Sequence, residues 1–385
     1  MLHFTEEELA GRRAQAIALM EERGLDGLLM FRQESMFYLT GYDTFGFCFF
    51  QCLYLGADGR LALITRAPDL RQARNTSMIG DIRIWVDRDG ATPATELKAM
   101  LSEFGCAGKT LGIEYEAYGL TARNGMAVNA ELDGFCTLKD ESELISELRV
   151  VKSPAELAYV RRAAELADDA LAAAHALTGP GVFEGDILAA MQGAVFKGGG
   201  DYPGNEFIIG SGSDALLCRY FTGRRTLAEQ DQLTLEFAGA YRHYHACMMR
   251  TIPVGPVGPV RDAQIDMHSA CVEALEACRE ALRPGNIVGS VFDAHAGVMD
   301  RRGYRHARMN ACGYSLGAVF APIWMDFPMF YHGNPVEIRP GMVFFAHMIL
   351  MDSEADLAMN VGETFIVTED GNERLSRMPT DLVCR

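Results

Sequence analysis

The sequence lacks several features that would place the protein in a specialised class. It has no clustered basic run, since 35 Lys and Arg residues are outnumbered by 52 Asp and Glu residues and the net charge is −17. Such a charge disfavours nucleic acids and anionic membranes as partners, because their surfaces attract cationic side chains. No stretch reaches the roughly 18 uncharged apolar residues of a membrane-spanning helix, and the first residues lack the cationic start and apolar run of a signal peptide. We therefore expect a cytoplasmic protein.

Two further absences narrow the class. The ten cysteines are scattered without the spacing of a disulfide framework, which favours free thiols in a reducing compartment. No Gly-rich phosphate-binding loop occurs early in the chain, so a nucleotide-binding N-terminal domain is disfavoured. What is present is the composition of an ordinary globular protein, 49% hydrophobic and 23% charged, in a chain of 385 residues that is long enough for two cores.

The first 150 residues predict a small α/β domain, because helical and strand patterns alternate along them. A helix is expected from Thr5 to Glu22 and a buried strand over Leu28–Phe31, and a β-hairpin should join Phe45–Leu55 to Leu61–Thr65. We interpret Ser35–Asp43, which is aromatic and polar, as a loop.

The remainder of the chain predicts two helix pairs around a curved sheet. The clearest helix start is Ser153-Pro-Ala-Glu156, which has a capping Ser, Pro at the first helical position and Glu at the third. Residues 313–317 and 321–326 are interpreted as loops, and residues 342–350 and 362–368 as strands. The expected helices are residues 153–177, 184–197, 262–282 and 287–303.

Residues 232–251 concentrate ionisable side chains in a predicted hairpin, with the turn at Ala238-Gly-Ala240. Alternation along the second strand would place His243, His245, Cys247 and Met249 on one face and Arg250 on the other. One histidine alone would be a core residue satisfied by hydrogen bonds. Two histidines and a thiol on one face, near Glu236, favour a functional site.

This hairpin resembles that of the creatinase and aminopeptidase P superfamily, which carries the pattern Tyr-x-x-Asp-x-x-Arg-Thr. Arg250-Thr251 matches the last two residues of that pattern. Val151–Glu156, Gly313–Gly317 and Arg339–Val343 resemble, in the same order, the family's linker, its Gly-His-x-x-Gly turn and the approach to its next strand. The resemblance implies an α+β chain, with a creatinase-type α/β domain over residues 1–150 and a pita-bread catalytic domain over residues 151–385.

The same resemblance identifies the positions where the metallopeptidases of this superfamily hold two divalent ions. Those positions are Glu236, Cys247, Tyr314, His347 and Gly362. One carboxylate among five positions is too few for two hard ions, which need several oxygen ligands. We therefore expect no metal and no other cofactor. A single soft metal on His245, Cys247 and His347 stays open as an alternative, because Cys and His are the usual zinc ligands.

Loss of the metals points to the creatinase-like branch, which includes ectoine hydrolase. The run Leu235–His245 is similar to a run in that enzyme, and residues 199–203, 38–43 and 313–315 also resemble its segments. The resemblance implies a metal-independent hydrolase of a C–N bond in a small zwitterion, an ectoine- or creatine-like amidine, guanidino compound or amide. Three alternatives remain: a metal-dependent Xaa-Pro dipeptidase or aminopeptidase, a lyase acting on a sulfonium solute, and an inactive binding homologue.

A hydrolase without metal needs side chains to activate water and to stabilise the oxyanion. We expect His245 or His347 to act as general base, Glu236 to orient the base or hold a substrate cation, and Tyr314 or His243 to donate to the transition state. Covalent catalysis by Cys247 is a further alternative, since a nearby imidazolium would lower the thiol pKa. The other candidates for substrate binding are Arg250, Tyr42, Asp201, Tyr202, Asp326, His332 and Cys247.

The expected partners are a small-molecule substrate and a second copy of the chain. In creatinase-like dimers a loop of the N-terminal domain contributes to the neighbouring active site, and the resemblance assigns that part to Ser35–Asp43. The alternative is that this loop packs on its own sheet.

Overall fold

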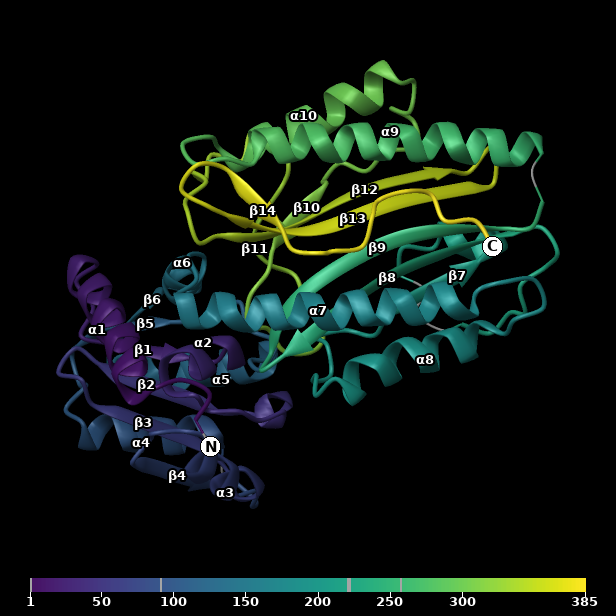
Figure 1. Cartoon of the computed structure of the whole chain (residues 1–385). Helices are drawn as coiled ribbons and strands as arrows, with labels where there is room; N and C mark the ends of the chain where they lie inside the picture. Colours follow the sequence, from purple (N-terminus) through teal and green to yellow (C-terminus); the bar gives the residue numbers. More distant parts are fainter. Residues whose placement is uncertain (1, 91, 220–222, 257) are drawn as a thin grey trace. The chain divides into compact units, whose positions relative to one another are not determined.

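The computed structural model describes residues 2–90, 92–219, 223–256 and 258–385. The chain divides into two compact units, one up to Arg149 and one from Val150 onward, coloured purple to blue and teal to yellow in Figure 1. Within the described ranges, no helix combines the length and the apolarity needed to cross a bilayer.

The first unit is built on a six-stranded mixed sheet with the order β4-β3-β2-β1-β5-β6. Strand β1 pairs antiparallel with β2 and parallel with β5, so helical crossovers are needed on the β5 side. The predicted α/β domain and its first helix, capped by Thr5, are confirmed. The strands are β1 (Gly27–Met30), β2 (Cys52–Gly56), β3 (Leu61–Arg66), β4 (Asp81–Trp85), β5 (Thr110–Ile113) and β6 (Thr137–Asp140). The helices are α1 (Glu6–Glu22), α2 (Gln33–Thr40), α3 (Ala67–Thr76), α4 (Pro93–Glu103), α5 (Ala122–Leu132) and α6 (Leu144–Arg149), with the 3-10 turn η1 (Gly46–Cys48).

The prediction of a loop over Ser35–Asp43 is wrong. Most of the segment is helix α2, which ends at Gly41 in the left-handed conformation with φ of 79°. Its apolar side chains, Met36 and Leu39 among them, belong to a buried cluster of the first unit itself. The aromatic residues that made the segment look exceptional are core residues, which agrees with the alternative that it packs on its own sheet.

The second unit is built on an eight-stranded curved sheet with the order β11-β10-β12-β13-β9-β8-β7, and β14 pairs with β13 (Figure 1). Its centre is formed by two long antiparallel pairs, β8 with β9 and β12 with β13. The strands are β7 (Ile208–Ser211), β8 (Asp231–Tyr241), β9 (Tyr244–Val254), β10 (Gly313–Ser315), β11 (Asp326–Met329), β12 (Val343–Asp352), β13 (Leu357–Val367) and β14 (Asn372–Arg374), and η2 (Gly212–Leu216) follows β7.

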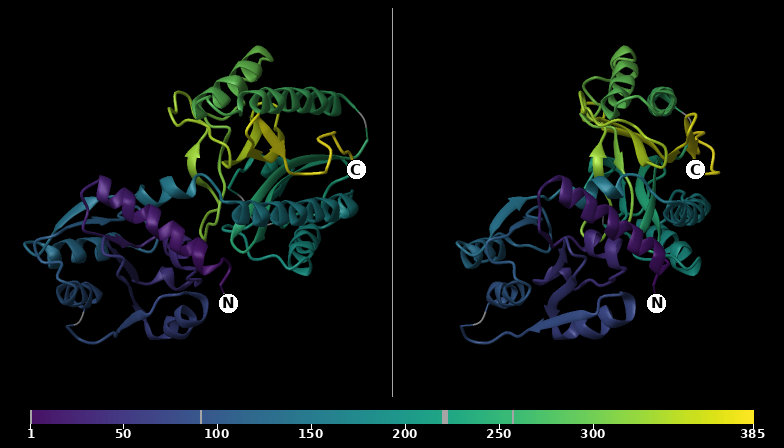
Figure 2. Two further views of the ribbon diagram at one scale, coloured as in Figure 1. Left: turned by 60° about the vertical axis from the view of Figure 1, so that its left-hand side comes forward. Right: turned by 90° about the vertical axis from the view of Figure 1, so that its left-hand side faces the viewer.

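Two helix pairs pack on this sheet, as predicted. Helix α7 contacts β8 and β9 and carries α8, while α9 contacts β12 and β13 and carries α10. In both views of Figure 2 the green helices α9 and α10 lie beside the yellow-green strands. Ser153 and Glu156 form the predicted capping box at the start of α7. The helices are α7 (Pro154–Leu177), α8 (Glu184–Lys197), α9 (Pro259–Ala281) and α10 (Val288–Arg301).

The hairpin of β8 and β9 exists, but its turn was predicted at the wrong place. Arg242 and His243 form the turn, with φ of 51° and 65°, and Ala238-Gly-Ala240 continues β8. The glycine is needed for a different reason: a Cβ on Gly239 would collide with the backbone of α7 at Ala163. Gly239 therefore allows a close helix–sheet approach rather than a turn.

Two predicted loops contain strands. Residues 313–315 form β10, which pairs with β12, and Asp326 begins β11. Both strands are short, three and four residues, so they show too few alternations to be recognised without their pairing partner.

Candidate active site

The five positions that correspond to metal ligands lie on neighbouring strands of the curved sheet. Glu236 on β8 and Gly362 on β13 both pair with Met249 on β9, and Cys247 lies two residues before Met249. His347 on β12 is the partner of Gly362. Tyr314 on β10 pairs with Phe345, two residues before His347. The register thus brings residues of five strands together, and four of these residues carry side chains.

At the centre of these five positions, the side chains of Trp324, Tyr314 and Glu236 form a hydrogen-bonded chain. The indole Nε1 of Trp324 donates to the Tyr314 hydroxyl at 2.8 Å, and that hydroxyl donates to Glu236 Oε1 at 3.2 Å. Burial raises the pKa of Glu236 to about 7, although the Tyr314 hydrogen bond and the Arg219 charge act in the opposite direction. Glu236 therefore exchanges its proton near neutral pH, the range in which an acid or base is most useful to an enzyme.

His347 is the basic group of the same cluster. Its ring centroid lies 5.5 Å from that of Tyr314 and 5.5 Å from that of Phe345. Burial, together with the charge of Arg219, lowers the pKa of His347 to about 4. Its Nδ1 is buried and has no hydrogen-bond partner among the described residues. At neutral pH His347 is thus a neutral imidazole that can accept a proton.

Cys247 belongs to the same cluster as Glu236, Tyr314 and His347, but its thiol stays protonated. Burial, followed by the charge of Glu236, raises the pKa of its thiol well above the usual value. A thiol that keeps its proton is a poor nucleophile. This argues against the alternative of covalent catalysis by Cys247.

The residues present do not fit a two-metal centre. Gly362 offers no ligand atom, and a Cβ built on it would lie 2.7 Å from the ring of Phe345, which fills the space that a longer side chain would need. The Tyr314 hydroxyl is engaged by Trp324 and Glu236. Among the described residues, the group of three His, Cys or carboxylate side chains that is close enough for one ion lies elsewhere in the unit. The same finding disfavours a soft metal on His245, Cys247 and His347.

His245 and His243 are engaged near the end of the hairpin. Nε2 of His245 accepts a hydrogen bond of 2.8 Å from the amide of Gly204. The ring of His243 stacks on Phe320 with centroids 4.1 Å apart, and its amide donates to Asp201 Oδ2 at 3.2 Å. These contacts position the turn, so the geometry favours His347 over His245 as the base.

Arg250 and His332 do not join the cluster. Arg250 forms an ion pair with Glu363 and donates to the carbonyl of Gly362 at 3.1 Å, so its guanidinium is engaged within the sheet. His332 is exposed, and its Nδ1 lies 2.7 Å from Asp293 Oδ1. A role for either residue in substrate binding is not supported by these partners.

The last three predicted binding residues are placed as follows. Tyr42 is buried in the first unit, where its hydroxyl bonds Gln51 Oε1 at 3.2 Å. Tyr202 is 81% exposed, and its ring packs on Phe196. Asp326 lies beside Gly317, on which a Cβ would be 3.1 Å from Asp326 Oδ2. None of these contacts tests a binding role, which stays a prediction.

Two residues of the cluster were missed by the sequence analysis. Trp324 holds the Tyr314 hydroxyl, and Arg219 supplies the positive charge that acts on both Glu236 and His347. The signals were weak: Trp324 lies in residues 321–326, which were interpreted as a loop, and Arg219 lies outside the motifs that carry the resemblance.

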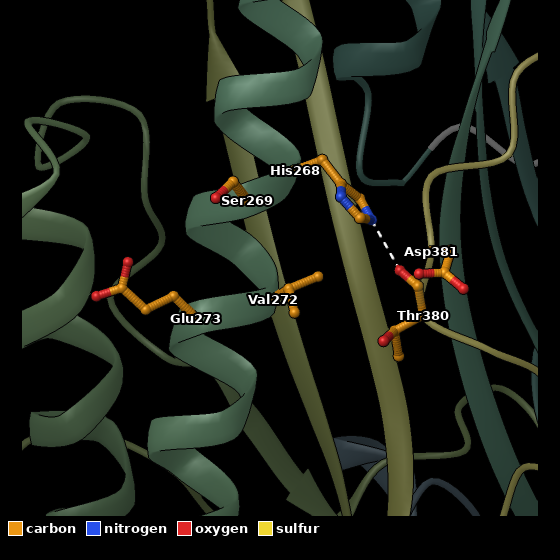
Figure 3. Close-up of a pocket in the computed structure, with 6 residues that line it drawn as sticks. All are labelled: His268, Ser269, Val272, Glu273, Thr380 and Asp381. Carbon is orange, nitrogen blue, oxygen red and sulfur yellow. Dashed lines mark hydrogen bonds between the residues drawn. The ribbon is translucent and has the colours of Figure 1, made fainter.

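A surface hollow of about 420 Å³ lies elsewhere in the second unit (Figure 3). Its lining residues are Thr380, Asp381 and four residues of α9, namely His268, Ser269, Val272 and Glu273. Nε2 of His268 lies 2.9 Å from the carbonyl of Thr380. It shares no residue with the cluster of Glu236 and His347.

A curved sheet flanked by two helix pairs, with the candidate catalytic cluster on neighbouring strands, defines the pita-bread class of hydrolases. Residues 158–369 match metallopeptidase family M24, and residues 12–151 match the creatinase/prolidase N-terminal domain. The chain belongs to family M24 and, with both domains present, to the creatinase and aminopeptidase P superfamily.

Relatives of the whole chain carry different activities. The ectoine hydrolase of Halomonas elongata is 28% identical over 409 residues, which covers 99% of this chain and 98% of that protein. The Xaa-Pro dipeptidase of Pyrococcus furiosus is 21% identical and covers 97% and 99%. Among solved structures, the prolidase of Thermococcus sibiricus superposes with a TM-score of 0.88 at 19% identity, over 99% of this chain and 100% of that one. These likenesses support a hydrolase with the predicted α+β architecture.

Proposed function

We propose that the protein is a metal-independent hydrolase that cleaves a C–N bond in a small zwitterion carrying an amidinium or guanidinium group. The observation that carries the proposal is the pair of Glu236 and His347, a carboxyl with a pKa of about 7 and a neutral imidazole, at positions where the metallopeptidases hold ions. Such a pair supplies a negative charge and a proton acceptor without any metal.

The surroundings of Glu236 favour a cationic substrate. When ionised, Glu236 is a buried carboxylate that needs a positive partner to offset its desolvation. The rings of Tyr314 and Phe345 lie 5.5 Å apart beside it, and Trp324 adjoins Tyr314. Aromatic faces attract flat cations. Arg219 is exposed, and its charge acts on both Glu236 and His347, so it is suited to bind a substrate carboxylate.

The relative named ectoine hydrolase supports this substrate class. Ectoine is a cyclic amidine with a carboxylate, and creatine is a guanidino compound with a carboxylate. Both combine the cation that Glu236 would hold with the anion that Arg219 would hold.

The proposed chemistry uses His347 as general base. His347 takes a proton from water as the water oxygen attacks the amidinium carbon, which lies over the ionised Glu236. The imidazolium then returns the proton to the departing nitrogen as the C–N bond breaks. Tyr314, held between Trp324 and Glu236, keeps the carboxylate in place.

A binding experiment tests the substrate class. We expect ectoine or creatine, at about 100 times its dissociation constant, to raise the melting temperature of the protein by roughly 5 °C, because a ligand that binds the folded state alone adds about 2.7 kcal/mol. An Xaa-Pro dipeptide at the same concentration should give no shift. A shift with the dipeptide and none with either zwitterion would contradict the proposal.

A homodimer remains part of the proposal, without a role for the buried segment 35–43. The exposed Phe45 and Phe49, which follow that segment, are 83% and 49% exposed and are the better candidates for a contact with a second copy. The cytoplasmic location stays a prediction.

A further inference from the structure

A second group of reactive side chains lies in the core of the second unit, apart from the candidate active site. Cys278 on α9, His295 on α10 and Cys312 just before β10 offer three ligand atoms that all lie within 4.8 Å of one another. Their exposed fractions are 1%, 1% and 0%. In Figure 1 helices α9 and α10 lie above β12, and β10 is the neighbour of β12 within the sheet. Cys278 and Cys312 belong to the apolar cluster between these helices and the sheet.

His295 is the feature that ordinary core packing does not explain. Its Nδ1 lies 3.2 Å from Met348 Sδ, and its Nε2 is buried without a hydrogen-bond partner among the described residues. A buried ring nitrogen without a partner costs free energy. Burial also lowers the His295 pKa to about 3, which keeps the ring neutral with one lone pair available. A neutral imidazole fixed by its other nitrogen is the form that binds metal.

The two thiols complete a set of soft ligands. Cys278 Sγ lies 3.5 Å from the carbonyl of Val291 and 4.0 Å from Met348 Sδ, so its contacts are weak ones that a metal bond would replace. Cys271, seven residues earlier on α9, is equally buried but lies 3.8 Å from the carbonyl of Met359 and is not part of the group. A cysteine can therefore be buried on α9 without lying near the other two ligand atoms, so burial alone does not explain the group.

We propose that Cys278, His295 and Cys312 supply three ligands of a structural zinc site, with the thioether of Met348, whose Sδ lies 4.0 Å from Cys278 Sγ, as the fourth. Zinc favours Cys and His, and its bonds of about 2.0–2.3 Å hold ligand atoms roughly 3.5–4 Å apart, so a small contraction of the group would enclose the ion. Binding converts two thiols to thiolates and releases two protons to solvent. Two thiolates neutralise one divalent ion, which suits an apolar core, whereas a monovalent ion would leave a buried negative charge.

The site lies directly behind the strand that carries the candidate base. The carbonyl of Cys312 accepts a hydrogen bond of 2.9 Å from the amide of His347, and Met348 is the residue that follows. A bound ion would therefore tie α9 and α10 to β10 and β12 and hold the backbone of His347. Its role is structural and does not depend on the proposed reaction.

The experiment uses the full chain, stripped with chelator under reducing conditions and incubated with one equivalent of Zn²⁺ until uptake ceases. We expect one zinc per chain after dialysis, release of two protons, and a rise in melting temperature of roughly 5 °C. Co²⁺ in place of Zn²⁺ should give thiolate-to-cobalt absorption in the near ultraviolet.

Substitutions of the proposed ligands, compared with substitutions of other buried cysteines, test where the zinc binds. Cys312→Ser and His295→Gln should lose the zinc and the cobalt absorption, whereas the matched control Cys271→Ser should keep both. Cys247→Ser should also keep both, since Cys247 belongs to the other cluster. Zinc binding that survives Cys312→Ser, or disappears in Cys247→Ser, would overturn the proposal.

The unaltered protein tests the proposal even if the variants fail to fold. Absence of bound zinc and of proton release in the unaltered chain would overturn it. So would a mass two daltons below that of the fully reduced chain, measured without reductant, if Cys312→Ser removes the deficit, because Cys278 and Cys312 would then be a disulfide pair.

Discussion

Replacing His347 with Ala should lower kcat for the proposed substrate by about 10²–10⁴-fold, the usual contribution of a general base. The ring is neutral because its pKa is lowered to about 4, and its Nδ1 is unpaired among the described residues. His245 shares these properties, but its Nε2 already accepts a hydrogen bond from Gly204. The measurement is kcat by NMR of the substrate and product, together with the melting temperature of the variant, which shows whether the fold is kept.

His245→Ala is the matched comparison. His245 is also neutral, with a pKa of about 4, but its Nε2 accepts from Gly204 and the ring is completely buried. We expect this variant to lose about 2–4 kcal/mol of stability, through the cavity and the unpaired Gly204 amide, while the folded fraction keeps most of its kcat. If kcat stayed near normal in His347→Ala and was lost in His245→Ala, His245 would be the general base and His347 the structural residue.

Replacing Glu236 with Gln should lower kcat/KM by about 10²-fold or more, because a buried partner of a substrate cation contributes roughly 3–5 kcal/mol. The pH profile gives a second signature. With a Glu236 pKa of about 7, the carboxylate forms as the pH rises through neutrality, so kcat/KM of the unaltered protein should rise between pH 6 and 8 by roughly tenfold. The Gln variant should show no such rise.

Stability should respond to pH in the opposite direction. A carboxyl whose pKa is raised in the folded state, here from 4.5 to about 7, binds its proton more tightly when folded. Stability contributed by the protonated form is therefore lost as the pH rises from about 4.5 through 7. Glu236→Gln should remove that loss, and an unchanged pH dependence in the variant would show that Glu236 does not titrate in this range.

The sequence predicted those elements that local chemistry specifies. Helix α7 was placed because Ser153 and Glu156 form a capping box, which depends on four consecutive residues. The turn of the hairpin was misplaced because Gly239 resembles a turn residue, whereas its requirement comes from α7, which is far away in sequence. Segment 35–43 was misjudged for a related reason, since burial of α2 depends on its partners in the first unit.

The candidate site was predicted in part for the same reason. The positions of Glu236, Cys247, Tyr314 and His347 were identified from a known pattern of motifs. The bond from Tyr314 to Glu236 joins β10 to β8, and Trp324 reaches Tyr314 from a segment outside the motifs. Such contacts depend on strand pairing and cannot be derived from spacing. The group of Cys278, His295 and Cys312 was missed because its members lie on three separate elements.

We expect hydrolysis at this site to need no metal, and turnover with and without an added divalent ion tests this expectation. Turnover of ectoine and creatine is followed by NMR with chelator present, and again after excess Mn²⁺ is added, with an Xaa-Pro dipeptide as the comparison substrate. Zinc retained at Cys278 does not disturb the comparison, because Mn²⁺ prefers oxygen ligands to thiolates. We expect turnover of one of the two zwitterions at the same rate with and without Mn²⁺, and no turnover of the dipeptide. Turnover of the dipeptide alone, appearing only with Mn²⁺, would contradict it.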